Sequence, residues 1–123
     1  MKSKYLRDIN CERKNYLDKE RRKIHKEEIK KYGISSEETW NLDISFIEFI
    51  YVTFKMYNEY NRIDTHIQYF FIDNEEWDMQ KGIDYIIDET EKCLISYRDN
   101  FSDTKIPEKI YDVLKQLIPL MWW

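Results

Sequence analysis

The stretch Trp40–Tyr60, WNLDISFIEFIYVTFKMYNEY, decides how the rest of this chain is interpreted. After WNLD almost every residue is apolar or aromatic, and the clear exceptions are Glu48, Lys55 and Glu59. At ~100° per residue these three lie within roughly 20° of one line, so they form one narrow polar stripe on a helix. A helix that is apolar nearly all round is typical of a core. We therefore predict a central buried helix over 43–60.

A β-strand is the alternative for this stretch, because Ile, Phe, Tyr, Val and Thr are common in it. In a strand Glu48 would point to the same face as Ile50, and Lys55 would fall on the other face. Neither face would then be purely apolar, so the pattern favours the helix.

Two polar signals precede the apolar run. Asp43 is placed to act as an N-cap, with its carboxylate accepting a hydrogen bond from the amide of Ser45 or Phe46. Further upstream, Ser35 and Glu38 have the spacing of a capping box. We therefore expect a short helical turn to begin near Ser35.

A second amphipathic helix is predicted over 74–97. Asp73 and Glu76 again have capping-box spacing at its start. Its apolar side repeats at i, +4, +7, +11, +14 and +18, through Met79, Ile83, Ile86, Thr90, Cys93 and Tyr97. The opposite side carries Asp84, Asp88 and Glu91, which we interpret as a solvated acidic face because no calcium-loop motif accompanies them.

The fold class predicted from these patterns is all-α, a compact domain of about four helices. A last helix is expected over 107–118, with Pro107 in its first turn and an apolar side at i, i+3, i+4 and i+7. The connector 61–73, NRIDTHIQYFFID, is open between a short strand and an irregular loop.

The charges divide the chain into two parts. Residues 1–33 hold twelve Lys and Arg against six Asp and Glu, a net +6, and residues 34–123 hold eight against eighteen, a net −10. From about Asp8 to Tyr32 the sequence predicts one long charged helix, ended by Gly33 at the C′ position. We expect this basic arm to lie solvated across the acidic core of a single domain, with Leu17 and Ile24 as a thin apolar seam.

Composition restricts the class of protein. A chain of 123 residues is long enough to bury a core, and no run approaches the ~20 apolar residues of a membrane span. The N-terminus is charged and lacks the apolar segment of a secretory signal, so we expect a cytoplasmic protein. Cys11 and Cys93 lack CxxC spacing, and we interpret both as free thiols, with a disulfide or a metal site as the alternatives. The absence of Ala and the abundance of Lys, Ile and Asn indicate an AT-rich genome, such as that of a low-GC bacterium or its phage.

The sequence shows no pattern of a catalytic site. Walker, GxGxxG, GxSxG, HExxH and zinc-ligand motifs are absent, and Gly33 and Gly82 are the sole glycines. His66 has no second histidine, cysteine or acid at ligand spacing. We therefore expect a protein that is not an enzyme and needs no metal or cofactor.

Two groups of side chains are candidate binding residues for other molecules. Met121, Trp122 and Trp123 end the chain and form either a lid on the core or an exposed patch for a partner protein or second subunit. The connector offers aromatic rings and cations that could bind a nucleotide: Arg62, His66, Tyr69 and Phe70.

The basic arm offers a third group, for the phosphates of nucleic acid. Its members are Lys14, Arg21, Arg22, Lys26 and Lys30. Six acids are interspersed in the same arm, so nucleic acid is the less favoured partner of this chain.

Two short motifs carry a resemblance to a known group of proteins. They are Trp40-Asn41-Leu42-Asp43 and Glu75-Glu76-Trp77-Asp78. Over roughly 35–93 the chain resembles a family of small uncharacterised proteins from tailed bacteriophages, with a Trp-(Ser/Asn)-(Leu/Phe)-Asp motif, an apolar helix and a Glu-Glu-Trp-(Asp/Glu) motif. The family connector often holds Gly-Tyr-Pro, which 61–73 lacks. The resemblance implies a phage or prophage origin and a small helical module, with no catalytic residues to carry over.

Three functions follow as expectations. The first is a phage or prophage accessory protein that binds and blocks a host protein, including a component of anti-phage defence, in an infected or lysogenic low-GC bacterium. The second is a sponge that sequesters a nucleotide immune signal through the connector. The third is nucleic-acid binding through the basic arm.

Overall fold

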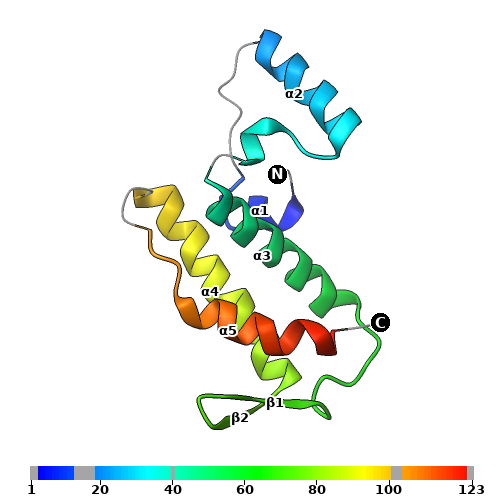
Figure 1. Ribbon diagram of the computed structural model, residues 1–123, viewed down its shortest axis with the longest axis vertical. Coiled ribbons are helices and arrows are strands. Elements are labelled where there is room, and N and C mark those ends of the chain that lie inside the picture. The colour runs from blue at the N-terminus through cyan, green and yellow to red at the C-terminus, as the bar shows by residue number, and fades with distance from the viewer. Residues whose placement is uncertain (1–2, 13–18, 40, 101–103, 122–123) are drawn as a thin grey trace.

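A computed structural model describes residues 3–12, 19–39, 41–100 and 104–121 of the chain, which are mostly helical with one small two-stranded sheet (Figure 1). The helical fold class is thereby confirmed, and the sheet is an addition to it. The elements in chain order are α1 (Lys4–Asp8), α2 (Lys19–Tyr32), the 3-10 turn η1 (Ser36–Thr39), α3 (Leu42–Tyr60), β1 (Tyr69–Ile72), β2 (Glu75–Asp78), α4 (Met79–Asn100), α5 (Glu108–Leu117) and the 3-10 turn η3 (Ile118–Leu120).

The core lies between α3 and α4, which run antiparallel along each other (Figure 1). Hydrogen bonds join them near both ends. Asn41 Nδ2 donates to Tyr97 Oη at 3.4 Å, and Gln80 Nε2 donates to Asn58 Oδ1 at 2.9 Å. The apolar stripe predicted for the second helix is confirmed, since its members from Met79 to Cys93 are buried.

The start of the central helix differs from the prediction. Asn41, with φ +51°, is the N-cap of α3 and makes no side-chain cap hydrogen bond. Asp43 lies inside the first turn, and its carboxylate accepts from the adjacent amide of Ile44 at 2.8 Å. The prediction that Asp43 is the N-cap was therefore wrong. Its charge still lies at the positive end of the helix dipole.

The last helix is close to its prediction. Ile110, Val113, Leu114 and Leu117 are all buried. Pro107 is the N-cap of α5 rather than a residue of its first turn, and α5 ends at Leu117, followed by η3. This helix packs on both α4 and the sheet, which closes the core on that side (Figure 1).

The predicted start of the second helix was wrong, because Glu75–Asp78 forms a strand. Asp73 and Asn74 both have positive φ, +51° and +64°, as in the type I′ turn that joins two hairpin strands. Asp and Asn tolerate this conformation better than other non-glycine residues, so the pair makes a turn instead of a capping box. Asp78 supplies the helix cap, accepting from the amide of Lys81 at 2.6 Å.

The hairpin is attached to α4 through its inner side chains. Phe70 pairs with Trp77 across the strands, with ring centroids 6.0 Å apart, and both are buried. Gly82 lies directly under Phe70, and a Cβ atom there would come within 2.7 Å of Phe70 Cζ and 3.3 Å of Leu117 Cδ2. The missing side chain of Gly82 therefore lets the sheet approach α4.

The N-terminal arm is not one helix. Helix α1 is a separate short helix, followed by Asn10 at φ +56°, and its Leu6 is fully buried in the core. Arg98 Nη1 donates to the carbonyl of Ile9 at 2.9 Å, which ties this segment to the end of α4. The first residues of the arm therefore belong to the body of the domain.

Helix α1 also explains the polar stripe of α3. Glu48 is buried, Lys55 Nζ lies 5.9 Å from the centre of the Tyr5 ring, and Glu59 accepts a hydrogen bond from Tyr5 Oη. The polar stripe therefore runs from a buried residue, Glu48, to an exposed one, Glu59, along the side of α3 that α1 contacts. The sequence alone did not show that a short N-terminal helix would pack against it.

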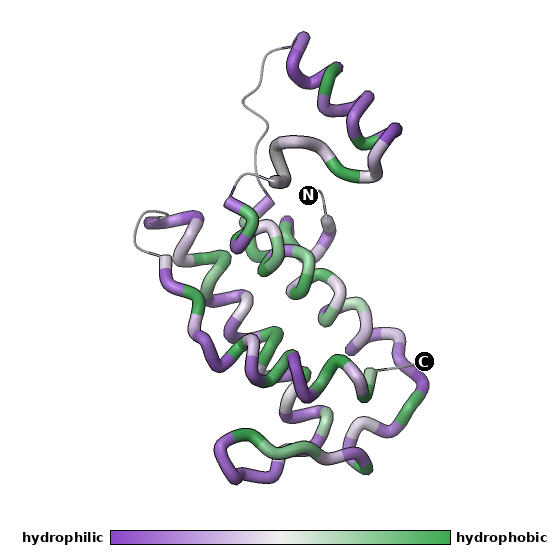
Figure 2. Tube along the Cα trace, viewed as in Figure 1, coloured by the Kyte–Doolittle hydropathy of each residue, from purple (hydrophilic) through white to green (hydrophobic). Residues whose placement is uncertain are grey.

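Helix α2 stands away from the body, and among the described elements its main contact is with η1 (Figures 1 and 2). It buries none of its residues, although Gly33 follows it at φ +81° as predicted. Ile24 and Ile29 lie ~140° apart around the helix, too far apart for one apolar side. The prediction that the arm lies across the core was therefore wrong, and Leu17 of the expected seam lies outside the described residues.

Gly82→Ala is expected to destabilise the protein by about 1 kcal/mol, because overpacking against Phe70 outweighs the ~1 kcal/mol by which alanine favours a helix. Urea unfolding followed by circular dichroism measures the change. Adding Phe70→Leu should make the alanine less costly, since the clash is relieved. If Gly82→Ala were more stable than the wild type, the close approach of Phe70 to Gly82 would be contradicted.

Leu6→Ala should lower the free energy of unfolding by about 2–4 kcal/mol, as for other leucines removed from a core. Ile24→Ala in α2 is the matched control and should change it by less than about 0.5 kcal/mol, because this side chain is half exposed. If both substitutions lowered the free energy of unfolding equally, the conclusion that α1 belongs to the body and α2 does not would be contradicted.

Candidate functional site

An apolar stripe on α3 points away from the core. Five large side chains form it, and we call this set the outer face of α3: Leu42, Phe46, Phe49, Met56 and Tyr60. Their exposed fractions range from 37% to 64%. They follow i, i+4, i+7, i+14 and i+18, which places them within about 40° of one line along the helix. The stripe therefore runs the length of α3.

The sequence interpretation treated α3 as buried all round, and this was wrong for the outer face. Helix α4 makes the main contact with α3, α1 and η1 make smaller ones, and no described element buries the five residues of the outer face. The same i, +4, +7 spacing is visible in the sequence. The spacing did not identify an exposed side, because apolar residues occur on every side of the helix.

The outer face is larger than a scatter of single apolar residues. From these fractions it exposes on the order of 500 Å², given ~150–250 Å² for a whole aromatic side chain. The largest apolar patch on a typical soluble monomer is about 300–600 Å² and is often functional, so the outer face has the size of such a patch. Thr53 fills the i+11 position, and its hydroxyl donates to the carbonyl of Phe49 at 2.8 Å, so no free polar group interrupts the stripe.

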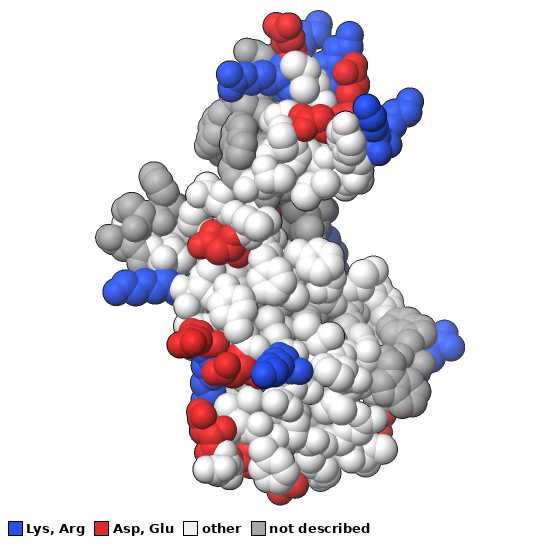
Figure 3. Space-filling model, in the orientation of Figure 1, with Lys and Arg blue, Asp and Glu red and all other residues white. Residues whose placement is uncertain are grey.

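The apolar surface continues onto α5. Phe46 stacks on Tyr111, with ring centroids 6.1 Å apart and planes 18° apart. Tyr111 and Ile118 are both more than two-fifths exposed. Figure 3 shows a broad surface with few charged side chains in the region of α3 and α5. The candidate site is therefore an apolar surface, with α3 at its centre.

A second exposed apolar surface lies on the hairpin but has a different character. Tyr69 and Phe71 point outward from β1, opposite Asp78 and Glu76 on β2. Each ring thus has a carboxylate as its cross-strand neighbour on the same face. The outer face of α3 contains no acid, which makes it the better candidate for an apolar partner.

The C-terminal patch predicted from the sequence is described in part. Met121 is half-buried and packs against the core cluster. Trp122 and Trp123 lie outside the described residues, so their role in binding stays a prediction.

The four connector residues predicted to bind a nucleotide are not assembled into a stacking site. Phe70 is 6% exposed and belongs to the core, and it points to the opposite face of β1 from Tyr69. Arg62 and His66 are exposed in the segment before β1. The prediction that Phe70 stacks on a ligand was wrong, because strand alternation turns it inward.

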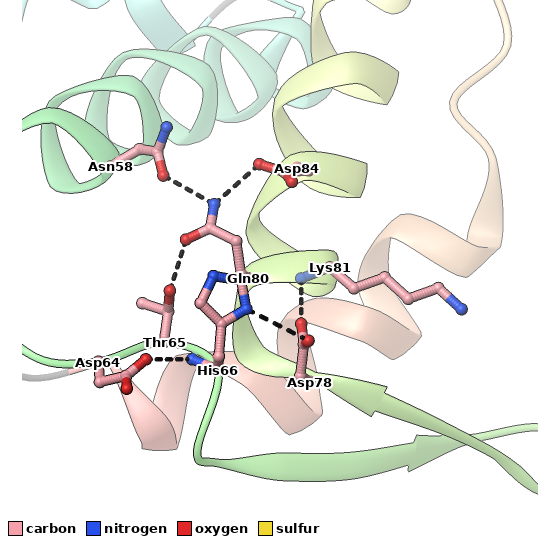
Figure 4. Close-up of polar contacts among 8 residues, drawn as sticks. All are labelled: Asn58, Asp64, Thr65, His66, Asp78, Gln80, Lys81 and Asp84. Atoms are coloured by element: carbon pink, nitrogen blue, oxygen red, sulfur yellow. Dashed lines mark hydrogen bonds and ion pairs between the residues drawn. The ribbon is translucent and has the colours of Figure 1, made fainter.

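The polar groups around the connector are joined in a network (Figure 4). Thr65 Oγ1 donates to Gln80 Oε1 at 2.5 Å, and Gln80 Nε2 donates to both Asn58 and Asp84 at 2.9 Å. The amide of Gln80 also donates to the carbonyl of Thr65 at 3.0 Å. This network ties the connector to α3 and α4, so its role is structural.

His66 lies beside the network. Its amide donates to Asp64 Oδ1 at 2.9 Å, and its Nδ1 atom is 3.5 Å from Asp78 Oδ2 (Figure 4). The other oxygen of Asp78 caps α4. The pair is solvated and its carboxylate already has a structural partner, so nothing in the geometry prepares it for proton transfer.

The residues predicted to contact phosphates lie mostly on α2. Arg21, Arg22, Lys26 and Lys30 are all exposed there, and Lys14 lies outside the described residues. Arg21 is on the same side of the helix as Glu28, whereas the other three share a different side.

The described residues contain no group of three or more His, Cys, Asp or Glu side chains arranged to hold a metal ion, and no helix long and apolar enough to cross a membrane. Cys11 and Cys93 are free, and burial raises the pKa of both thiols. A raised pKa makes a thiol less reactive at neutral pH.

Comparison with known proteins adds no relative. No known protein family, no curated protein and no solved structure matches this chain. The resemblance to small phage proteins therefore stays a prediction.

A polar pocket of about 370 Å³ lies between α1 and α3. Its walls are Lys4, Tyr5, Asp8, Lys55, Asn58 and Glu59. None of the residues predicted to bind a ligand lines it. The hydrogen bond to Glu59 is the main cause that raises the pKa of Tyr5 to about 12. The pocket therefore contains the contact that fixes α1 beside the end of α3.

The Tyr5–Glu59 hydrogen bond is expected to weaken at high pH. Because the folded pKa of about 12 exceeds the ordinary value of 10.0, the bond contributes fully below pH 10 and is lost as the pH rises through 12. Ultraviolet titration of tyrosinate should show one tyrosine moving toward 10 in Glu59→Gln. Tyr5→Phe should remove that difference. A titration unchanged by Glu59→Gln would contradict the assignment.

Proposed function

We propose that this chain is a non-enzymatic binding protein that attaches to another protein through the outer face of α3. In its specific form the proposal is the one expected from the sequence, a phage or prophage accessory protein that blocks a host protein. The observation that supports it is the uninterrupted apolar stripe of α3, where five large side chains are exposed along a single line.

The shape of the stripe suits one kind of partner element. It is one helix wide, and its spacings of four, three, seven and four residues keep the a and d register of a coiled coil, with Thr53 in the remaining position. An amphipathic helix can lay its own apolar side along such a seam. Phe, Tyr and Met are also residues that interfaces favour. We infer that the partner presents an amphipathic helix to α3.

Binding alone is enough for the proposed role. A protein that covers a functional groove or helix of its partner blocks it without chemistry. The polar groups nearest to a catalytic arrangement are His66 and Asp78, which lie near solvent, and Asp78 also caps α4. The nucleotide-sequestering alternative is not favoured, because Phe70 is buried in the core.

The double substitution Phe49→Asp and Met56→Asp should abolish partner binding and leave the fold intact. Both side chains are more than half exposed, so their loss removes little of the core, whereas two carboxylates in the seam would be desolvated on binding. The measurement is affinity capture from a lysate of a low-GC bacterium, quantified by mass spectrometry for wild type and variant. Circular dichroism checks the fold of each bait.

The matched control is Ile67→Asp with Phe71→Asp on the hairpin side, which adds the same charge at side chains of greater exposure. A third bait carries Trp122→Ala and Trp123→Ala. A partner retained by the last two baits and lost by the α3 variant supports the proposal. A partner lost only with the tryptophans would move the site to the C-terminus.

Self-association is tested on the same proteins by analytical ultracentrifugation. A wild type that is monomeric at micromolar concentration leaves the outer face open for a host protein. A stable dimer that the α3 variant converts to monomer would show that a second copy occupies this face, and would overturn the proposal of a host partner there.

A further inference from the structure

Helix α2 carries five cations on one side. We call them the basic face of α2: Lys19, Arg22, Lys23, Lys26 and Lys30. At ~100° per residue they lie within an arc of about 100°, and no acid falls inside it. Glu20 and Glu27 lie together at one border of this arc, and Glu28 is almost opposite its centre. Acids and bases alternate along the sequence of α2, but in the helix the acids lie outside the basic face.

The basic face points away from the body of the domain. On the opposite side, Glu28 accepts hydrogen bonds from the amide of Ser36 at 2.9 Å and from its hydroxyl at 3.0 Å. These bonds and the αL residue Gly33 hold that side against η1. All five cations are exposed and have no hydrogen-bond or ion-pair partner among the described residues. The fold therefore presents their charges outward without neutralising them.

The acidic body does not cancel this charge. Helix α2 holds seven Lys and Arg against three Glu, a net +4 with His25 neutral. Charges in solvent are largely screened beyond a Debye length of about 8–10 Å at physiological salt. Helix α2 stands clear of the core, and its charged side chains, more blue than red, lie together at one end of the molecule (Figure 3). A polyanion can approach that end without contacting the acidic surface.

We propose that the basic face of α2 binds the phosphates of double-stranded nucleic acid, as a site separate from the outer face of α3. An α-helix, about 10–12 Å wide, fits a major groove about 12 Å wide. The basic face is ~16 Å long, close to half of a 34 Å helical turn of duplex. Four of its five members are lysines, which neutralise phosphates without reading bases, so binding is independent of sequence.

Other polyanions fit this helix less well. Proteins that bind single strands stack bases on aromatic side chains, and the basic face has none. Helices that lie on membranes need a broad apolar side, and α2 has Ile24 and Ile29 on separate sides. Binding to the phosphates of a duplex requires only cations, and the basic face of α2 provides them.

Fluorescence anisotropy with labelled duplexes of two unrelated sequences tests the site, using the full-length protein. The wild type should bind both equally, with log K falling against log salt at a slope of about −4. The triple variant Arg22→Gln, Lys26→Gln and Lys30→Gln should reduce that slope by about 3 and weaken binding at least about tenfold at low salt. Glutamine maintains helix propensity, so circular dichroism should be unchanged.

The matched control is Lys92→Gln, Lys105→Gln and Lys115→Gln, which removes the same charge from exposed lysines of the body. It should bind duplex as the wild type does. The proposal is overturned if the wild type fails to bind duplex at low salt or if the control loses as much affinity as the α2 variant. It is also overturned if polyglutamate or anionic vesicles compete as well as DNA of equal charge, since the partner would then be an acidic protein or a membrane.

Discussion

The packing of α3 against α4 is the contact on which every other described element depends. Ile47, Ile83 and Ile86 are fully buried along it, and each such side chain contributes about 1.5–3 kcal/mol. The remaining elements are too small to be stable alone. A helix as short as α1 does not persist in water, and an isolated two-stranded hairpin is marginal at best. Leu6 and Phe70 attach these two elements to the core that α3 and α4 make.

The same packing leaves one side of α3 uncovered. Helix α4 covers the core side of α3, and α1 and η1 make smaller contacts with it. The side chains of α3 that face α4 are of ordinary core type. The residues of the outer face have the same character, yet they face solvent. Apolar surface of this extent is costly to hydrate and promotes association, which is why a partner for it is the simplest physical explanation.

The two proposed surfaces depend on different forces and lie on different elements. The outer face of α3 offers burial of apolar area, which charge screening by salt does not weaken. The basic face of α2 offers charge, which weakens as salt rises. The Glu28–Ser36 hydrogen bonds hold α2 at the edge of the domain, so its charges stay apart from the acidic body. The protein could therefore engage a protein and a polyanion at the same time.

The sequence by itself determined the elements with a strong and simple period. The buried stripe of α4 from Met79 to Cys93, the buried side of α5 and the end of α2 at Gly33 were all readable, because local spacing decides which side of a helix is apolar. The hairpin start was misread. An Asp followed three residues later by Glu, as at Asp73 and Glu76, fits both a capping box and a hairpin turn. The contact of Phe70 with Trp77 favours the turn.

The candidate surfaces were decided by the tertiary structure. The apolar residues of α3 lie on every side of the helix, and their pattern does not state which sides will find neighbours. That depends on where α1 and α5 dock, a choice made by contacts distant in sequence such as Tyr5 with Glu59 and Phe46 with Tyr111. The basic face of α2 follows from its helical period, but its exposure follows from the packing of α2, which contacts η1 through the opposite side. Periodicity fixes the sides of an element, and only packing decides which of them remain in solvent.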